Sequence, residues 1–390
     1  MTTCSSRCCF DLAKGSLNKQ GEELCGDQAA FWTDGSQAIL ILADGLGSGV
    51  KANILATLTT RIALTLLKKD ATAAETFETI LTTLPTCRVR GIAYCTLAIV
   101  RADSDGQCSI FEYDTPPAML IRNGTPLALQ REEAWIRGRR VGTTRCRLEP
   151  GDCLMLVSDG AIHAGLGNVF NHGWEWENVQ DYVARINPNS AAEAAARLLA
   201  TCRGLYGGSP GDDTTVAALM LKPHRELHLL VGPPADAGLD GDVVAAFMEA
   251  PGEKVLCGGT TAALVARELR RPLTTSMEYP DPEVPPTATL EGVALVTEGV
   301  VTLNAVLRHL EAYREHLLNF DPDAAGGAAA LCRKLLFDCT HVHFWVGTAE
   351  NPAHNHPEFH RSYLPKQVVL ERLMALLPTL GKTVTHQTLK

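Results

Sequence analysis

The chain has 390 residues, of which 46% are hydrophobic and 20% are charged, and its formal net charge is -9. This composition is typical of a folded globular protein, and the length favours two domains over one. The negative charge excludes a nucleic-acid binder that relies on phosphate contacts, because such a surface needs an excess of Lys and Arg. Neutral or basic protein surfaces are therefore the expected partners.

The N-terminal residues lack the basic start and the apolar run of a secretory signal. No segment reaches the roughly 18 consecutive apolar residues that indicate a membrane span. The 13 cysteines are odd in number, and most lie in apolar segments, where reduced cysteines behave as small buried hydrophobes. We therefore expect a cytoplasmic protein that does not engage a membrane.

The elements of the N-terminal part follow one another in a pattern of strands and helices. An apolar run predicts a buried strand over 38–43, which stops at a glycine-rich turn. Helices are predicted over 52–69 and 73–84, strands between 92 and 122, a capped helix from 190 to about 204, and a last strand over 216–221. Hairpin signals outnumber strand–helix–strand alternations, so we expect an α+β domain with an antiparallel β-sandwich flanked by helices.

The pattern changes at residues 222–226, which we take as a domain boundary. Beyond it, strands over 227–231, 255–257 and 293–296 each run into a loop, and the last two loops lead into predicted helices. Such units are typical of an α/β fold. We expect one domain over 1–222 and a second, smaller α/β domain over 227–390.

Aspartates recur at strand ends in the first domain. Asp44 and Asp159 each follow a predicted buried strand and precede a glycine, and Asp212 precedes another strand. Antiparallel neighbours bring the end of one strand beside the start of the next, so these carboxylates can converge. Gathered carboxylates repel unless a cation neutralises them, and hard oxygen ligands select Mg²⁺ or Mn²⁺. A single Asp-Gly pair is more often only a turn.

These segments resemble the metal-dependent type 2C serine/threonine protein phosphatases, in the bacterial subtype of the stage II sporulation protein E phosphatase. The matching motifs occur in family order over about the first 222 residues. They are Cys25-Gly26-Asp27, Ala43-Asp44-Gly45-Leu46-Gly47-Ser48-Gly49, Tyr113-Asp114-Thr115-Pro116-Pro117 with Arg122-Asn123-Gly124, Ser158-Asp159-Gly160, and Gly211-Asp212-Asp213-Thr214-Thr215-Val216.

The resemblance implies a catalytic site with two divalent cations, Mn²⁺ or Mg²⁺. Asp44 would bridge the two ions and the Gly45 carbonyl would bind one of them. Asp159 and Asp212 would bind the other, and Asp27 would act through bound water. The resemblance further implies that a water bridging the cations attacks phosphoserine or phosphothreonine of a protein substrate in bacterial signalling.

The chain departs from the family pattern in two places. Leu46 stands where many eukaryotic relatives have a His after the Asp-Gly pair, so the general acid is not identified. No phosphate-binding Arg precedes Asp27, and Lys14 or Lys19 is the candidate substitute. The helices predicted over 52–69 and 73–84 stand where this subtype places its regulatory element, which suggests that they control Asp44.

The second domain resembles no family of known activity. Residues 258–261 (Gly-Gly-Thr-Thr) join a predicted strand to a predicted helix. Such a segment can be a phosphate-binding loop or only a tight turn with a Thr cap. The turn is favoured because the Lys of a P-loop is missing. Thr297-Glu298-Gly299 could share that crevice. His341, His343, His354, His356 and His360, with Glu358, gather possible metal ligands, although a polar loop explains most of them.

The sequence thus predicts a protein phosphatase that hydrolyses a phosphoprotein, with a signalling regulator as a plausible substrate. The second domain would sense a small ligand or a partner and regulate the enzyme. Two alternatives remain at this point: a non-catalytic scaffold that binds a phosphoprotein, and an enzyme centred on the second domain that acts on a nucleotide or another phosphate.

Overall fold

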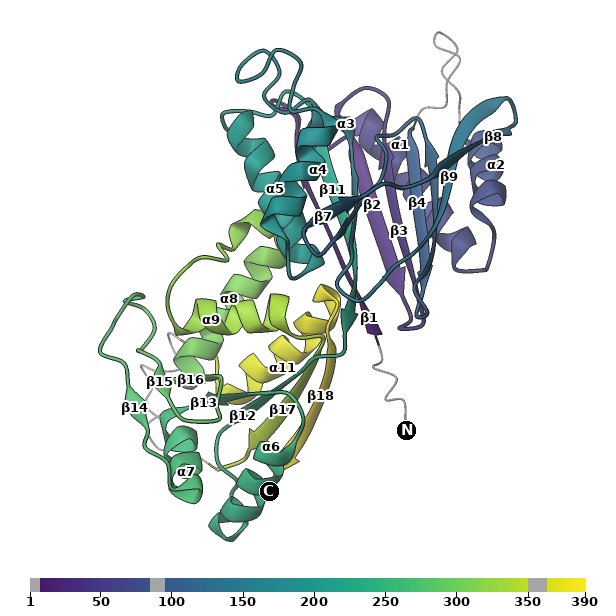
Figure 1. Cartoon of the computed structure of the whole chain (residues 1–390). Coiled ribbons are helices and arrows are strands. Elements are labelled where there is room, and N and C mark those ends of the chain that lie inside the picture. Colours follow the sequence, from purple (N-terminus) through teal and green to yellow (C-terminus); the bar gives the residue numbers. More distant parts are fainter. Residues whose placement is uncertain (1–7, 85–94, 350–362) are drawn as a thin grey trace. The chain divides into compact units, whose positions relative to one another are not determined.

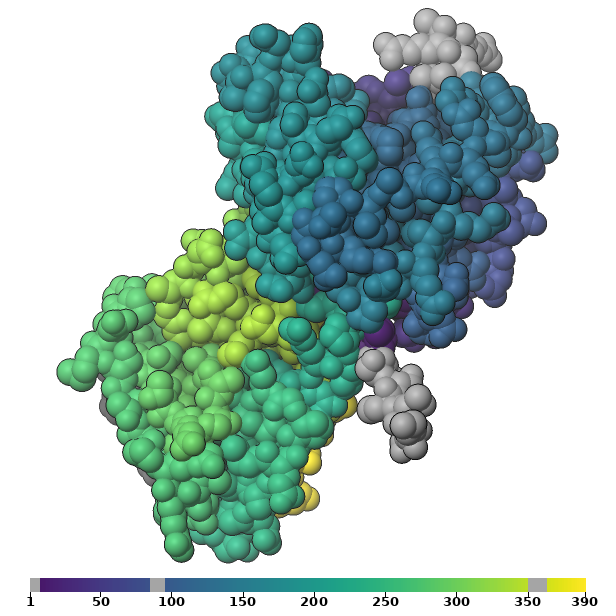
Figure 2. Space-filling view, viewed as in Figure 1, coloured from purple at the N-terminus to yellow at the C-terminus, as the bar shows by residue number. Residues whose placement is uncertain are grey.

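The computed structural model describes residues 8–84, 95–349 and 363–390. The chain forms two compact units, Met1–Pro223 and His224–Lys390, and each is described by itself. Figure 1 labels their helices and strands, and Figure 2 shows the atoms of the N-terminal unit in purple to teal and those of the C-terminal unit in green to yellow.

Two antiparallel sheets form the N-terminal unit. The five-stranded sheet has the order β1 (Cys8–Leu17), β11 (Thr214–Pro223), β10 (Cys153–Val157), β6 (Met119–Arg122), β7 (Thr125–Leu127). The six-stranded sheet has the order β2 (Asp27–Thr33), β3 (Gln37–Asp44), β4 (Leu97–Asp103), β5 (Gln107–Tyr113), β9 (Arg139–Arg147), β8 (Arg131–Ile136). The predicted α+β class with antiparallel sheets is confirmed.

The main core of this unit lies between the two sheets. Leu40, Leu42 and Val100 of the six-stranded sheet pack with Leu156 and Leu219 of the five-stranded sheet, and all five are at most 1% exposed. Period-2 alternation explains the arrangement, because every second residue of a strand faces the same side. The opposite residues of β3, such as Ile39 and Ile41, form a second cluster with the helices.

Helices cover the outer faces of this sandwich. These helices are α1 (Gly49–Leu67) and α2 (Ala73–Thr83) on the six-stranded sheet, α4 (Trp176–Ile186) and α5 (Ala191–Leu205) on the five-stranded sheet, and the short α3 (Asp159–Ile162) after β10. Side-chain caps set two of the starts: Thr72 makes a capping box with Glu75, and the Ser190 hydroxyl accepts from the Glu193 amide.

Helix α1 begins three residues earlier than predicted and ends two residues earlier, so Lys68 and Lys69 lie beyond its last turn. By length and composition alone it could cross a membrane. However, one face of α1, including Leu55, Ala56 and Ala63, is buried in the cluster on the six-stranded sheet, as in a core helix of a globular protein.

The C-terminal unit is built on a mostly parallel sheet. The sheet has the order β14 (Thr274–Thr275), β15 (Ala288–Thr289), β16 (Leu295–Thr297), β13 (Glu253–Cys257), β12 (Glu226–Val231), β17 (His341–Gly347), β18 (Thr383–Leu389). From β16 to β18 all neighbours are parallel, and the chain order reverses between β12 and β17. This is a doubly wound α/β arrangement, which confirms the predicted class of the second unit.

Helices lie on both faces of this sheet (Figure 1). On one side α6 (Asp240–Glu249) and α7 (Gly259–Leu269) pack on Leu230, Leu256 and Trp345. On the other side lie α8 (Val300–Glu315), α9 (Gly327–Arg333) and α11 (Lys366–Leu376). Short turns of helix complete the unit: Ala237–Leu239, Leu317–Asn319, Lys334–Asp338 and Leu377–Leu380.

Phe77 fixes α2 on the sandwich. Its ring is 1% exposed and contacts Phe111 and Tyr113, with ring centroids 5.2 and 4.8 Å away. Truncating a buried Phe to Ala removes its burial and leaves a cavity, so Phe77→Ala should lower the free energy of unfolding by about 3–5 kcal/mol. Urea unfolding followed by circular dichroism measures this, with Thr79→Ala on the exposed side of α2 as the control. Equal losses in both variants would contradict the prediction.

Candidate functional site

The four predicted aspartates lie at one edge of the sandwich. Asp27, the first residue of β2, is the register partner of Asp44, the last residue of β3. In the other sheet, Val157 of β10 pairs with Val216 of β11, so Asp159 and Asp212 follow and precede paired strand ends. Each sheet therefore contributes two carboxylates to this edge.

Asp213 connects the two halves of the site. A Cβ atom placed on Gly26, beside Asp27, would lie 2.8 Å from Oδ2 of Asp213. Oδ1 of Asp213 accepts from the Lys19 amide at 2.9 Å. Sequence reasoning gave Asp213 no role, although the Asp212-Asp213 pair was the available signal.

Burial and charge repulsion together raise the pKa values of the carboxylates at this edge. Burial, together with the charges of Asp27, Asp159 and Asp212, raises the pKa of Asp44 to about 9. Burial also raises the pKa of Asp27 to about 6, with Asp213 adding to the rise and the hydroxyls of Ser158 and Thr215 opposing it. The pKa of Asp159 is raised by burial and by Asp212. Burial and mutual repulsion thus disfavour the charged forms of Asp27, Asp44 and Asp159, and a bound cation would oppose that effect.

The donor set fits hard divalent cations. Asp27 is 2% exposed and Asp213 4% exposed, and each has a buried Oδ2 atom without a hydrogen-bond partner among the described residues. Asp44, Asp159 and Asp212 are more accessible. Buried oxygens without donors, next to accessible carboxylates, are the ligands that Mg²⁺ and Mn²⁺ prefer.

The residues that follow Asp44 and Asp159 must be glycines, because neighbouring backbone atoms pack too closely for a side chain. A Cβ atom on Gly45 would lie 2.3 Å from the Ala52 carbonyl oxygen of α1, and one on Gly160 would lie 2.1 Å from the Asp213 carbonyl oxygen. No side chain fits at either position. Helix α1 therefore packs directly on the backbone that follows Asp44, which is where the predicted regulatory helices would have to act.

The two candidate lysines are placed differently. The Lys19 ammonium lies 3.5 Å from Oδ1 of Asp212, and both side chains are about 40% exposed (38% and 41%). The Lys14 ammonium instead donates to the carbonyl of Ala29 in β2. Lys19 is thus beside the carboxylates, whereas Lys14 is used in a hydrogen bond to the backbone. Leu46 is half-buried in the loop that follows Asp44.

In the C-terminal unit, the residues 258–261 form a tight turn into α7. The Gly232 amide donates to the Thr261 hydroxyl at 3.0 Å, so this hydroxyl supports the neighbouring strand end. At the next helix, the Val301 amide donates to Glu298 at 3.1 Å, and a carboxylate therefore occupies the start of α8. Both contacts favour the turn over a phosphate site. His354, His356, His360 and Glu358 lie outside the described residues.

Residues 34–222 match the sequence model of the family described as stage II sporulation protein E (SpoIIE). This range contains Asp44, Asp159 and Asp212 in the family order, and Asp27 precedes it. Residues 34–222 are a SpoIIE domain. The match confirms the resemblance read from the sequence motifs.

Solved structures with a similar fold include the phosphatase domain and a regulatory fragment of the cell fate determinant SpoIIE from Bacillus subtilis. Its TM-score is 0.47 at 21% identity, over 56% of this chain and 64% of that chain. The RsbU and RsbW domains of a Mycobacterium tuberculosis protein give a TM-score of 0.48 at 19% identity, over 63% of this chain and 68% of that chain. RsbX in complex with magnesium gives a TM-score of 0.40 at 16% identity, over 55% of this chain and 96% of that chain. None of the curated proteins compared with the sequence matches it.

Cation binding should stabilise the SpoIIE domain through Asp44. A ligand that binds only the folded state adds about 2.7 kcal/mol at a hundredfold excess over its Kd. We expect Mn²⁺ to raise the thermal midpoint of the full chain, and Asp44→Asn to abolish that rise. Without metal, Asp44→Asn should unfold at the same or a higher temperature, because it removes charge from a repulsive cluster.

Differential scanning fluorimetry in chelator and in Mn²⁺ measures both effects. Asp105→Asn, at an exposed hairpin turn, is the matched control and should respond as the wild type does. A Mn²⁺ shift that survives in Asp44→Asn would contradict the assignment of Asp44.

Proposed function

We propose that the N-terminal unit hydrolyses phosphoserine or phosphothreonine in a protein substrate, using two Mn²⁺ or Mg²⁺ ions. Asp27, Asp44, Asp159, Asp212 and the Gly45 carbonyl would hold these ions. The observation that carries the proposal is the convergence of two carboxylates from each sheet at one edge of a SpoIIE domain. Bound divalent ions would supply hydroxide near neutral pH and offset the charge of the phosphoryl oxygens.

The residues of the chain have distinct tasks in this proposal. The buried Asp27 and Asp213 provide negative charge that water cannot screen. The accessible Asp44, Asp159 and Asp212 face a substrate that must approach from solvent. Lys19 supplies positive charge beside Asp212, where a phosphoryl group would otherwise meet only carboxylates.

The substrate is a phosphoprotein, and a regulator of bacterial signalling is the class that we propose. The negative net charge favours a neutral or basic face on that partner. The C-terminal unit would sense a ligand or a partner, in keeping with its doubly wound sheet, and we place the whole protein in the cytoplasm. A nucleotide enzyme centred on this unit is disfavoured, because the Glu298 carboxylate already accepts from the Val301 amide at the start of α8.

Catalysis should depend on the carboxylates of both sheets. With Mn²⁺ and a phosphothreonine peptide, the full chain should release phosphate. Asp44→Asn and Asp159→Asn should each lower kcat at least about a hundredfold, equivalent to about 2.7 kcal/mol of barrier. Phosphate release measures this, with Asp105→Asn as the active control. A non-catalytic scaffold would instead bind the peptide without releasing phosphate, which would overturn the proposal.

Substitutions of Lys19 and Lys14 should affect different quantities, KM for Lys19 and thermal stability for Lys14. Lys19→Ala removes a charge beside Asp212, so we expect a higher KM for the phosphopeptide while the Mn²⁺ stabilisation is kept. Lys14→Ala removes a hydrogen bond to the Ala29 carbonyl and should lower the thermal midpoint with little change in KM. Steady-state kinetics and thermal melts of both variants measure the difference. The reverse pattern would make Lys14 the phosphate-binding residue.

A further inference from the structure

Five ligand-type side chains gather on neighbouring segments of the C-terminal unit. His224, Glu226 and His228 alternate along the chain at the start of β12, and His341 and His343 alternate along β17. Because β12 and β17 pair in parallel register, Glu226 stands opposite His341 and His228 opposite His343. Alternation and register together place Glu226, His228, His341 and His343 on the same side of the sheet, and the ring of His224, which precedes β12, packs on His341.

Glu226 is the centre of this group. His224 Nε2 lies 2.7 Å from its Oε1 atom, on one side of the carboxylate. His228 Nε2 and His343 Nε2 lie 3.3 and 3.8 Å from its Oε2 atom. The ligand atoms of Glu226, His228 and His343 all lie within 4.8 Å of one another.

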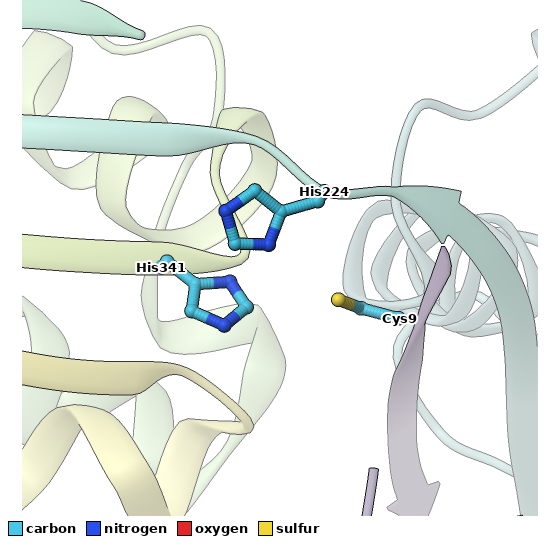
Figure 3. Close-up of side chains that lie close together, drawn as sticks. All are labelled: Cys9, His224 and His341. Carbon is cyan, nitrogen blue, oxygen red and sulfur yellow. The ribbon is translucent and has the colours of Figure 1, made fainter. Parts of the chain in front are cut away.

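The histidine rings pack against one another in two pairs, one stacked and one tilted. The rings of His228 and His343 stack with centroids 4.6 Å apart and planes at 16°. The rings of His224 and His341 have centroids 4.0 Å apart, and Figure 3 shows these two side by side. His228 is buried, and the His343 side chain is 28% exposed. Protonating several of these rings at once would set like charges in contact.

We propose that Glu226, His228 and His343 bind a first-row transition metal ion of the zinc type. Two imidazole nitrogens and a carboxylate oxygen suit Zn²⁺, whereas the oxygen-only site of the SpoIIE domain suits Mg²⁺ or Mn²⁺. Three protein ligands leave a fourth position for water or for an external ligand. The proposal is independent of the phosphatase activity, since its residues lie in the other unit.

Neighbouring side chains hydrogen-bond two of the ligands. Nδ1 of His343 hydrogen-bonds the Thr385 hydroxyl of β18, which leaves its Nε2 to the ion. The indole of Trp345 donates to Nδ1 of His228 at 3.1 Å. A Trp N–H can only donate, so the neutral His228 ring carries its proton on Nε2, facing Glu226.

Metal binding at His228 must therefore change its hydrogen bond to Trp345. When Nε2 becomes a ligand, the ring carries its proton on Nδ1, and the indole N–H loses its acceptor. The Nε2 proton is released to solvent and Nδ1 takes up a proton from solvent, so the ring stays neutral. Trp345 thereby becomes an internal reporter of ion binding.

The test uses the full chain with an excess of Mg²⁺, which occupies the SpoIIE site, and titrates Zn²⁺ by calorimetry and by tryptophan fluorescence. We expect one Zn²⁺ equivalent whose affinity falls at least about tenfold in Glu226→Gln and in His343→Ala. His386→Ala, an exposed histidine of β18, is the matched control and should bind as the wild type does. Trp345→Phe should keep the ion and lose the fluorescence change.

A second measurement guards against misfolding of a variant. Anomalous diffraction at the zinc edge of wild-type crystals should give a peak between Glu226, His228 and His343. Unchanged Zn²⁺ affinity in both Glu226→Gln and His343→Ala would overturn the proposal, as would an anomalous peak located only at other histidines. A Trp345 signal that responds to acid but not to Zn²⁺ would identify the cluster as a proton-binding group and would also overturn it.

Discussion

Mutual repulsion among carboxylates is the constraint on which the N-terminal unit depends. The sandwich brings Asp27, Asp44, Asp159 and Asp212 to one edge, at a cost in free energy that protons or cations reduce. The buried core between the sheets supplies the free energy that holds the carboxylates together, so stability and chemistry lie in separate layers of the same unit.

Much of this arrangement could be predicted from the sequence, because the relevant strands are strongly patterned. The apolar run over 38–43 became β3, and the capped segment after Ser190 became α5. In the N-terminal unit, strands β1, β2, β7, β8 and β9 were not predicted. In β8, four of the six residues from Arg131 to Ile136 are exposed and three are charged, so no apolar alternation was visible.

The histidine group shows a different limit of sequence reasoning. His341 and His343 were noticed because they alternate within one strand, but their partners were assigned to residues 354–360. Glu226 and His228 lie more than a hundred positions earlier in the chain, and only the parallel register of β12 with β17 reveals the proximity. Pairing between distant strands depends on the crossover helices that separate them, which local patterns do not encode.

The pairing of β1 with β11 has a consequence for biosynthesis. Cys8 pairs with Pro223 and Leu17 with Thr214, so β1 can pair only after a strand some two hundred residues later in the chain has been synthesised. Chain closure over such a span is slow and entropically costly. During synthesis on the ribosome, Asp27 and Asp44 are therefore made well before Asp212 and the strand β11 that follows it. The carboxylate edge can therefore be completed only after the last strand of the N-terminal unit has been made.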